Sequence, residues 1–272
     1  MEKVTVSVIM GIYNPQIHQL KKAVTSIIRQ SFGDWELLIY DDGSQKKYSH
    51  EIMALAKLDP RIFCYRGKEN KGLANALNKC IKLARGKYIA RMDCDDISLE
   101  RRLEKQVDFL DNYPEIGWVG CGAYLMADGE IWGVRKMERL PTNKDFLRYS
   151  PYIHPTIMFR KEILELAGGY NTSKFTRRCE DYNLFMRLHE KMEQGYNLEE
   201  LLFVYLEDED SYKKRTLKAG YYESIVRFAG FRKLEILKPS TIPYLVRPVV
   251  GAIIPRAFLM KIKSRSKTSR LY

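Results

Sequence analysis

The sequence contains few cysteines, and none of them has the spacing of a metal or disulfide motif. Five cysteines are scattered through 272 residues, and no CxxC pair occurs. This pattern argues against a zinc site and against a disulfide framework, and a reducing cytosol is the simplest compartment for it. The chain starts Met1-Glu2-Lys3 and passes directly into a strand-like run, so we expect neither a signal peptide nor a clean membrane span.

Both common phosphate-binding loops are also missing. No GxGxxG and no GxxxxGK(S/T) pattern occurs, so the usual dinucleotide and P-loop folds would lack their phosphate cradle. A metal ion and basic side chains would have to bind any ligand phosphates instead. Hydrophobic residues make up 45% of the chain and charged residues 29%, which is typical of a globular protein.

The net charge of +12 is concentrated near the C-terminus. Residues 213–272 contain 15 basic and two acidic residues, whereas residues 1–212 contain 31 basic and 32 acidic residues. This shift in composition predicts a boundary near Lys213. We therefore expect a nearly neutral body, 1–212, and a basic C-terminal extension, 213–272.

Short apolar runs alternate with helical patterns in the first part of the body. Strands are expected at 4–10, 35–40, 62–65 and 88–92, with helices at 17–30, 52–58 and 72–84 between them. Such alternation predicts right-handed crossovers and a doubly wound parallel sheet. We expect Ser98 to cap the next helix, which ends near Pro114.

The later part of the body has a more mixed pattern. A strand at 117–126 is followed by a turn and a hairpin partner at 131–134, and a short helix is expected at 145–149. A further strand is expected at 152–159, with a polar interruption at His154. The apolar spacing of Leu184 and Leu188 predicts a helix that begins near residue 180.

Three acidic residues follow the fourth predicted strand directly. Asp93, Asp95 and Asp96 lie where this strand ends, which is where ligands bind to open α/β sheets. Three adjacent carboxylates repel one another unless a cation lies among them. Mn²⁺ and Mg²⁺ suit oxygen ligands and commonly bridge to substrate phosphates. The alternative is a solvated acidic turn in which Asp95 or Asp96 caps the next helix.

The first two strands also end in residues that could bind a ligand. Tyr13 follows the first strand, and Asp41 and Asp42 follow the second. We expect these ends to meet the acidic turn in one crevice, where an aromatic ring and a carboxylate could bind a base by stacking and by accepting its N–H. Alternatively, Tyr13 is a packing residue and Asp41–Ser44 is only a turn.

Five separated runs together resemble one enzyme family. VSVIMGIYN, ELLIYDDGS, NKGLANALN, GKYIARMDCDD and CEDYNLFMRL occur in this order, and the set resembles family 2 glycosyltransferases of the GT-A fold. Residues 4–206 carry the resemblance, which is strongest to bacterial enzymes of capsule, lipopolysaccharide or exopolysaccharide synthesis. It implies a nucleotide-sugar-binding half, 1–97, an acceptor-side half, 98–212, and sugar transfer with inversion at the anomeric carbon.

The resemblance implies how a donor would be bound. Tyr13 would stack on the base, and Asp42, with Asp41 beside it, would accept a hydrogen bond from uracil, which favours a UDP-linked donor. Asp95 would hold Mn²⁺ or Mg²⁺, and Asp93 would contact the ribose or the metal shell.

Other residues are weaker candidates for the donor site. Asn70 and Lys71 resemble a stretch that approaches the donor, although Lys71 could equally be a solvated charge. His154 would lie near the donor phosphates, although a lone histidine more often has a structural role.

Glu180 and Asp181 resemble the catalytic acidic pair of the family. Asp181 would be the general base, which takes the proton of the acceptor hydroxyl, and Glu180 would belong to the donor-binding set. A base on one face of the sugar and a metal-bound diphosphate on the other gives a single in-line displacement. Alternatively, Asp181 only caps its helix.

The extension combines apolar and basic residues. Leu217, Tyr221 and Phe228 share one expected helix face, and the apolar run 242–255 contains three prolines. Such a segment suits the surface of an anionic membrane better than a membrane span. We therefore expect a peripheral enzyme on the inner face of the cell membrane, with a glycan or lipid-linked acceptor. The alternatives are a solvated tail or packing on the body.

Two rival classes fit the sequence less well. A sugar-phosphate nucleotidyltransferase would have a glycine-rich basic loop after the first strand, and residues 11–15 do not supply one. A module that binds nucleic acid through the basic tail would need an interleaved stacking surface, which is not seen. We therefore expect no nucleic-acid partner.

Overall fold

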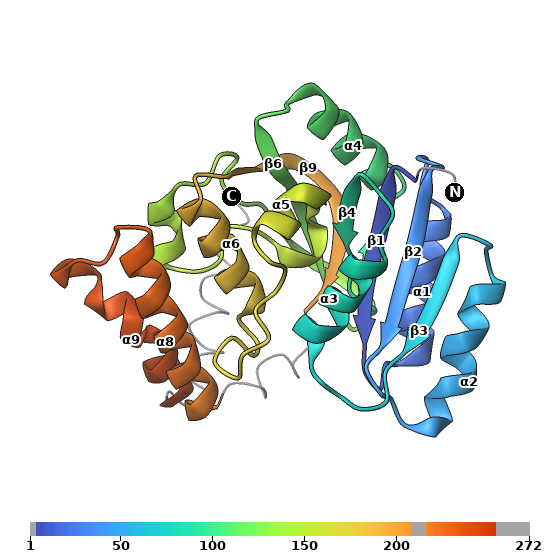
Figure 1. Ribbon diagram of the computed structural model, residues 1–272, viewed down its shortest axis with the longest axis horizontal. Helices are drawn as coiled ribbons and strands as arrows, with labels where there is room; N and C mark the ends of the chain where they lie inside the picture. The colour runs from blue at the N-terminus through green and yellow to red at the C-terminus, as the bar shows by residue number, and fades with distance from the viewer. Residues whose placement is uncertain (1–3, 208–215, 254–272) are drawn as a thin grey trace.

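A computed structural model describes residues 4–207 and 216–253, in which one mixed sheet is covered by helices on both faces (Figure 1). The strand order is β3-β2-β1-β4-β8-β6-β9-β5, and β7 pairs with β6. The parallel part consists of β1 (Val6–Ile12), β2 (Trp35–Asp41), β3 (Ile62–Arg66) and β4 (Tyr88–Arg91). Between these strands lie α1 (Ile17–Ile28), α2 (Lys46–Ala54) with the short turn η1 (Leu55–Lys57), and α3 (Leu73–Leu83). The predicted doubly wound half is confirmed.

The second half reverses the direction of the sheet. Strand β8 (Met158–Arg160) runs antiparallel between β4 and β6 (Ile116–Ala127), and β9 (Gln194–Leu206) is parallel to β6. The predicted hairpin is confirmed as β6 and β7 (Glu130–Arg135). The remaining elements are β5 (Ile97–Ser98), α4 (Arg102–Asn112), η2 (Asn143–Leu147), η3 (His154–Thr156), α5 (Lys161–Leu166) and α6 (Glu180–Glu190).

Two predicted elements differ from the structure. Ser98 lies in β5 and does not cap a helix; its backbone N–H donates to Ser26 Oγ, and α4 begins after Arg101 instead. The expected strand at 152–159 is reduced to β8, because His154–Thr156 form a 3₁₀ turn that Pro155 starts. In both places tertiary contacts override the local sequence pattern.

The core is divided between the two faces of the sheet. In β1, Val6, Val8 and Met10 pack on the side of α1, whereas Ile9 packs on the side of α3. This alternation follows from the two-residue period of a strand, and a central parallel strand must be apolar on both faces. The side of α3 also contains Trp118, whose ring centroid lies 5.4 Å from that of Tyr152.

The described part of the C-terminal extension packs on the body. Helix α8 (Leu217–Lys233) buries Val226 and Phe231 in the core cluster on the side of α3, and Gly230 lies against the Met186 side chain of α6. After η4 (Pro239–Thr241), α9 (Ile242–Ile253) packs on α8. The close approach is made at Gly220, where a Cβ would lie 2.7 Å from the Pro248 carbonyl oxygen. Packing on the body, one of the sequence alternatives, is therefore present.

Apolar side chains remain exposed on both helices of the extension. On α8 these are Leu217, Tyr221 and Phe228, as the sequence predicts; on α9 they are Ile242, Val246, Val250 and Ile253. The spacing of three or four residues places each set along one side of its helix. No helix among residues 4–207 and 216–253 combines the length and apolarity that a bilayer span requires.

We expect the Trp118→Ala variant to lose about 3–5 kcal/mol of unfolding free energy, because it opens a cavity among buried rings. Trp118 is fully buried, whereas Tyr149 is 57% exposed. The matched variant Tyr149→Ala should therefore change stability by no more than about 0.5 kcal/mol. Urea unfolding monitored by circular dichroism measures both values. Equal losses in the two variants would contradict this view of the core.

Candidate functional site

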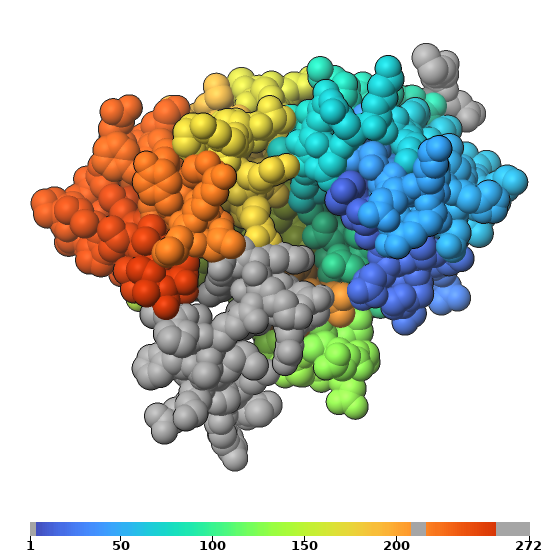
Figure 2. Space-filling view, turned by 90° about the horizontal axis from the view of Figure 1, so that it is seen from below, coloured from blue at the N-terminus to red at the C-terminus, as the bar shows by residue number. Residues whose placement is uncertain are grey.

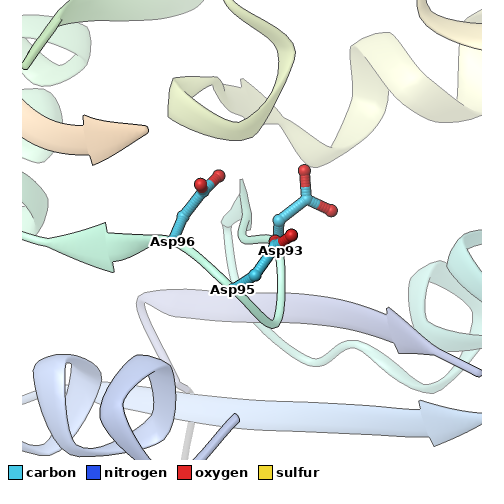
Figure 3. A group of neighbouring side chains, drawn as sticks. All are labelled: Asp93, Asp95 and Asp96. Carbon is cyan, nitrogen blue, oxygen red and sulfur yellow. The ribbon is translucent and has the colours of Figure 1, made fainter. Parts of the chain in front are cut away.

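The acidic turn after β4 forms a compact group of carboxylates. Oxygen atoms of Asp93, Asp95 and Asp96 all lie within 4.8 Å of one another (Figure 3). Asp96 is buried, and its Oδ1 accepts a hydrogen bond of 2.8 Å from the backbone N–H of Leu206. Burial and the charges of Asp93 and Asp95 raise the pKa of Asp96 well above its usual range. An all-oxygen set of this kind fits a hard divalent cation such as Mn²⁺ or Mg²⁺.

A buried arginine lies beside these acids. Arg91, the last residue of β4, is 2% exposed and forms an ion pair with Asp93. Its backbone carbonyl accepts a hydrogen bond of 2.8 Å from the buried guanidinium of Arg102 in α4. A buried guanidinium requires a charged or polar partner, and Asp93 supplies one. The strand end is therefore held in place from both its side chain and its backbone.

Glu180 and Asp181 occupy the first turn of α6 and share the electrostatic environment of the acidic turn. Burial and the charge of Glu180 raise the pKa of Asp181 to about 7, and Arg91 opposes this shift. The pKa of Glu180 is also raised, mainly by burial, and both Arg91 and Asp93 act on it. Cys179 is the N-cap residue and makes no side-chain capping bond, whereas Asp181 lies in the first turn, where the backbone N–H groups of Tyr182 and Asp181 lower its pKa. The helix-terminus role that the sequence also allowed therefore stays open.

Asp42 attaches the loop before α3 to the end of β2. Its Oδ2 accepts hydrogen bonds of 2.9 Å from the N–H of Lys71 and 2.6 Å from that of Gly72. Burial raises the pKa of Asp42, and Arg177 acts in the opposite direction. Asn70 and Lys71 therefore lie at the strand edge where the sequence places the donor.

Asp41 and Tyr13 have different environments at this edge. Asp41 is buried; its Oδ1 accepts a hydrogen bond of 2.8 Å from the N–H of Ser44, and its Oδ2 lies 3.3 Å from Arg66. Tyr13 directly follows β1 and is 50% exposed. The loops after β1 and β2 are joined because Ser44 Oγ accepts a 2.8 Å bond from the Asn14 N–H. Tyr13 is thus presented on a fixed loop with its ring open to solvent.

His154 is separated from the acidic groups by Tyr170. The imidazole is buried, and its Nε2 lies 2.8 Å from the Tyr170 hydroxyl. Burial, assisted by Arg91, lowers the pKa of His154 well below its usual range, so the ring is neutral at pH 7. Burial raises the pKa of Tyr170, the charge of Arg91 opposes this shift, and the charges of Asp181, Glu180 and Asp93 add to it. His154 is thus a buried histidine with a tyrosine partner, which is what the structural alternative predicts.

A cleft of about 610 Å³ joins several of these elements. Asn70, Lys71 and Gly72 line one side, and Glu180 lines the other together with the loop 171–178. The loop before α3 and Glu180 of α6 thus face one cavity. Arg91, Tyr170 and Arg177 belong to this environment and were not singled out by the sequence motifs. Arg91 could have been identified from the sequence, because a charged residue inside a predicted buried strand requires a polar partner.

Comparison with known proteins identifies the family of the chain. Residues 7–167 match the family model described as glycosyl transferase family 2. The putative glycosyltransferase EpsE of Bacillus subtilis is 36% identical over 261 residues, which are 93% of this chain and 91% of that protein. The O-antigen biosynthesis glycosyltransferase WbnJ of Escherichia coli is 30% identical over 87% of this chain and 91% of that protein.

A solved structure shows the same fold. The mannosyltransferase PcManGT of Pyrobaculum calidifontis, determined with GDP-Man and Mn²⁺, superposes with a TM-score of 0.66 at 18% identity and covers 97% of this chain and 80% of that one. The predicted GT-A fold is confirmed. The chain belongs to glycosyl transferase family 2 and is a glycosyltransferase.

Proposed function

We propose that the protein is an inverting, metal-dependent transferase that moves a sugar from a nucleotide donor, with UDP favoured, to a hydroxyl of a cell-surface glycan. One observation carries the proposal. Three clustered carboxylates and a second acidic pair with raised pKa values share one electrostatic environment around Arg91. Such an arrangement provides an oxygen-ligand cation site and a proton acceptor for a single reaction.

Asp181 is the general base of the proposed reaction. A carboxylate with a pKa of about 7 is half deprotonated at neutral pH and is a much stronger proton acceptor than a solvated aspartate. It takes the proton of the acceptor hydroxyl as that oxygen attacks the anomeric carbon from the face opposite the diphosphate. One attack on one face inverts the configuration, and no nucleophile beneath the sugar is needed.

Asp93 and Asp95 are the proposed ligands of the divalent cation, with Asp96 beside them. When bound, Mn²⁺ or Mg²⁺ neutralises the charge that develops on the leaving diphosphate. The residues fit this role because three carboxylates gather at one loop and the Oδ2 atom of buried Asp96 has no hydrogen-bond partner among the described residues. The Mn²⁺ complex of the Pyrobaculum mannosyltransferase supports the choice of metal.

The nucleotide is proposed to lie across the ends of β1 and β2. Tyr13 stacks on the base, and Asp42, with Asp41 beside it, fixes the base edge. Asn70 and Lys71 approach the donor from the loop that Asp42 anchors. Glu180 contacts the donor across the cleft. The predicted place of His154 near the donor phosphates is not part of this proposal, because its ring is buried and bonded to Tyr170.

The acceptor is proposed to be a glycan or a lipid-linked oligosaccharide met at the membrane surface. The name of WbnJ, an O-antigen biosynthesis glycosyltransferase, supports a role in polysaccharide synthesis. The exposed apolar residues of α8 and α9, within a segment of net charge +13, support contact with an anionic bilayer. Residues 254–272, which hold part of the predicted basic cluster, lie outside the described residues.

Asp181→Asn should lower turnover by about 10²–10⁴-fold, because the amide cannot accept the proton. The measurement is released nucleoside diphosphate from a panel of nucleotide sugars with Mn²⁺ and a cell-surface glycan extract. The wild type should use one donor of the panel, and we expect that donor to be a UDP-sugar. Donor binding should persist in the variant. Near-normal turnover of Asp181→Asn would show that Asp181 is not the general base. Glu190→Gln, at the far end of the same helix, is the matched control and should retain activity.

The activity of the wild type should rise with pH through about 7, since Asp181 accepts a proton only when ionised. Below that pH, kcat/KM should fall about tenfold per pH unit. Glu180→Gln removes the neighbouring negative charge that raises the pKa, so the midpoint should move to lower pH. Initial rates between pH 5 and 9 measure this profile. If the midpoint of the pH profile were the same in Glu180→Gln and the wild type, Glu180 would not act on the pKa of the titrating group.

Asp95→Ala should abolish the dependence of activity on Mn²⁺ and weaken Mn²⁺ binding by at least about tenfold, because one of three clustered ligands is lost. Calorimetric titration of Mn²⁺ reports binding independently of turnover. The control is Asp108→Ala, an exposed aspartate on α4. If Asp95→Ala bound Mn²⁺ as the wild type does, the metal would lie elsewhere.

Val246→Glu combined with Val250→Glu should reduce sedimentation with anionic liposomes at least about fivefold, because it places two charges on the exposed apolar face of α9. Both valines are about half exposed, so folding should persist. Ile131→Glu with Val134→Glu introduces the same charges at exposed positions of β7 and should leave sedimentation unchanged. Equal binding by both double variants would contradict docking through α9.

A further inference from the structure

A second cleft continues from the candidate site along α3. It has a volume of about 560 Å³ and lies between α3 and the segment from α5 to residue 172. Thr172 lines both clefts, and α3 lines the first with Leu73 and Ala74 and the second with residues from Asn75 to Lys82. The two clefts therefore adjoin along α3, and together they are called the groove. Because a helix rises 1.5 Å per residue, α3 gives this groove a length of roughly 16 Å.

The groove is strongly basic although the body around it is not. Its lining includes seven basic and two acidic side chains: Lys71, Lys79, Lys82, Lys161, Lys174, Arg177 and Arg178, against Glu165 and Glu180. Residues 1–212 as a whole contain 31 basic and 32 acidic residues. The positive charge is therefore a local feature of the groove. Clefts that concentrate charge of one sign attract ligands of the opposite sign.

Helix α3 presents polar residues to the second cleft on one side. Asn75 and Lys79 are four residues apart, and Asn78 and Lys82 are also four residues apart, so that all four lie along one face of the helix. Lys79 and Lys82 are exposed, and no described carboxylate lies within ion-pairing distance of either. Their charges are thus available to a ligand in the groove.

The opposite wall is fixed to α3 and is not a loose loop. Asn78 Oδ1 accepts a hydrogen bond of 2.8 Å from the Tyr170 N–H, and Asn78 Nδ2 donates one of 2.8 Å to the Tyr170 carbonyl. This approach requires Gly169, because a Cβ there would lie 2.5 Å from Asn78 Oδ1. In Figure 2 the yellow atoms around this wall lie between the orange atoms of α8 and the teal atoms of α3.

We propose that the second cleft, along α3, binds a negatively charged part of the acceptor, with Lys79 and Lys82 forming a subsite for an anionic group. The inference rests on the proposed function, since it assigns this cleft to the acceptor of that reaction. The inner end of the groove reaches Glu180, next to the proposed base, and the outer end extends along α3 away from the reacting carbon. An acceptor whose reacting hydroxyl lies at Asp181 would then place its neighbouring sugar or diphosphate group beside Lys79 and Lys82.

The anionic group has two possible sources, which share the same chemistry of negatively charged oxygen atoms. It is either the carboxylate of an acidic sugar in the acceptor chain or the diphosphate that joins an acceptor to a lipid carrier. A lysine ammonium binds either as a point charge. The two sources are distinguished by the probe that depends on Lys79 and Lys82.

The test measures binding without a donor and without added metal, so it is independent of catalysis. Trigalacturonic acid, maltotriose and farnesyl diphosphate are titrated into the full chain by calorimetry at 50 and 200 mM salt. Lys79→Glu combined with Lys82→Glu should lower the affinity for an anionic probe by about tenfold or more, since two attractive charges become repulsive. Wild-type affinity for that probe should fall as salt rises. Neutral maltotriose should not respond to either change.

Two further variants make the result interpretable. Lys46→Glu with Lys47→Glu reverses two charges on α2, outside the groove, and should bind all three probes as the wild type does. Lys79→Gln with Lys82→Gln removes the charges without reversing them and should give an intermediate loss. Circular dichroism checks that each variant is folded.

The outcomes separate the possibilities. A loss for trigalacturonic acid assigns the subsite to an acidic sugar, and a loss for farnesyl diphosphate alone assigns it to the carrier diphosphate. If the wild type binds neither anion, or if the Lys79 and Lys82 variants bind both unchanged, the proposal is overturned. Failure of the proposed function would appear differently, as the absence of donor turnover in the wild type while groove binding persists.

Discussion

The ion pair between Arg91 and Asp93 is the interaction on which the site depends. Arg91 is fully enclosed, and its charge acts on Asp93, Asp96, Glu180 and Asp181. Asp93 and Glu180 belong to distant segments, and the charge of Asp93 raises the pKa of Glu180 while that of Arg91 lowers it. Arg91 therefore offsets the repulsion between the turn after β4 and the first turn of α6. Arg102 and Gln106 complete the support, since Gln106 Nε2 donates to the carbonyls of Val119 and Thr156.

The remaining parts of the site are assembled by hydrogen bonds from side chains to the backbone of another segment. Asp42 attaches the end of β2 to the loop before α3, and Asn78 attaches α3 to residues 169–170. Both contacts need a glycine: a Cβ on Gly43, which has a φ of +77°, would lie 2.7 Å from the Glu69 backbone. Helix α3 thus lies between the carboxyl end of β2 and the wall formed by residues 169–170, and it connects the two.

The first half of the fold could be predicted from sequence because local and tertiary preferences agree there. Strands β1 to β4 are short, mostly apolar runs, the first three of which are each followed by a helix, and their carboxyl ends lie where the motifs place them. Ser98 was misplaced because its pairing partner, β9, is about a hundred residues away in the sequence. His154 was misread as part of a strand because its partner Tyr170 cannot be identified by periodicity. The motifs found the acids, but they did not identify the arginine that holds them together, since its role depends on burial.

The hydrogen bond from Leu206 to Asp96 connects two regions that the sequence treats as separate. Asp96 belongs to the acidic turn, and Leu206 is the last residue of β9, from which the chain continues toward the basic extension. The bond fixes one oxygen of the Asp96 carboxylate from a residue 110 positions further along the chain, while Oδ2 of the same carboxylate has no hydrogen-bond partner among the described residues. The end of β9 therefore helps to set the orientation of a side chain in the acidic turn.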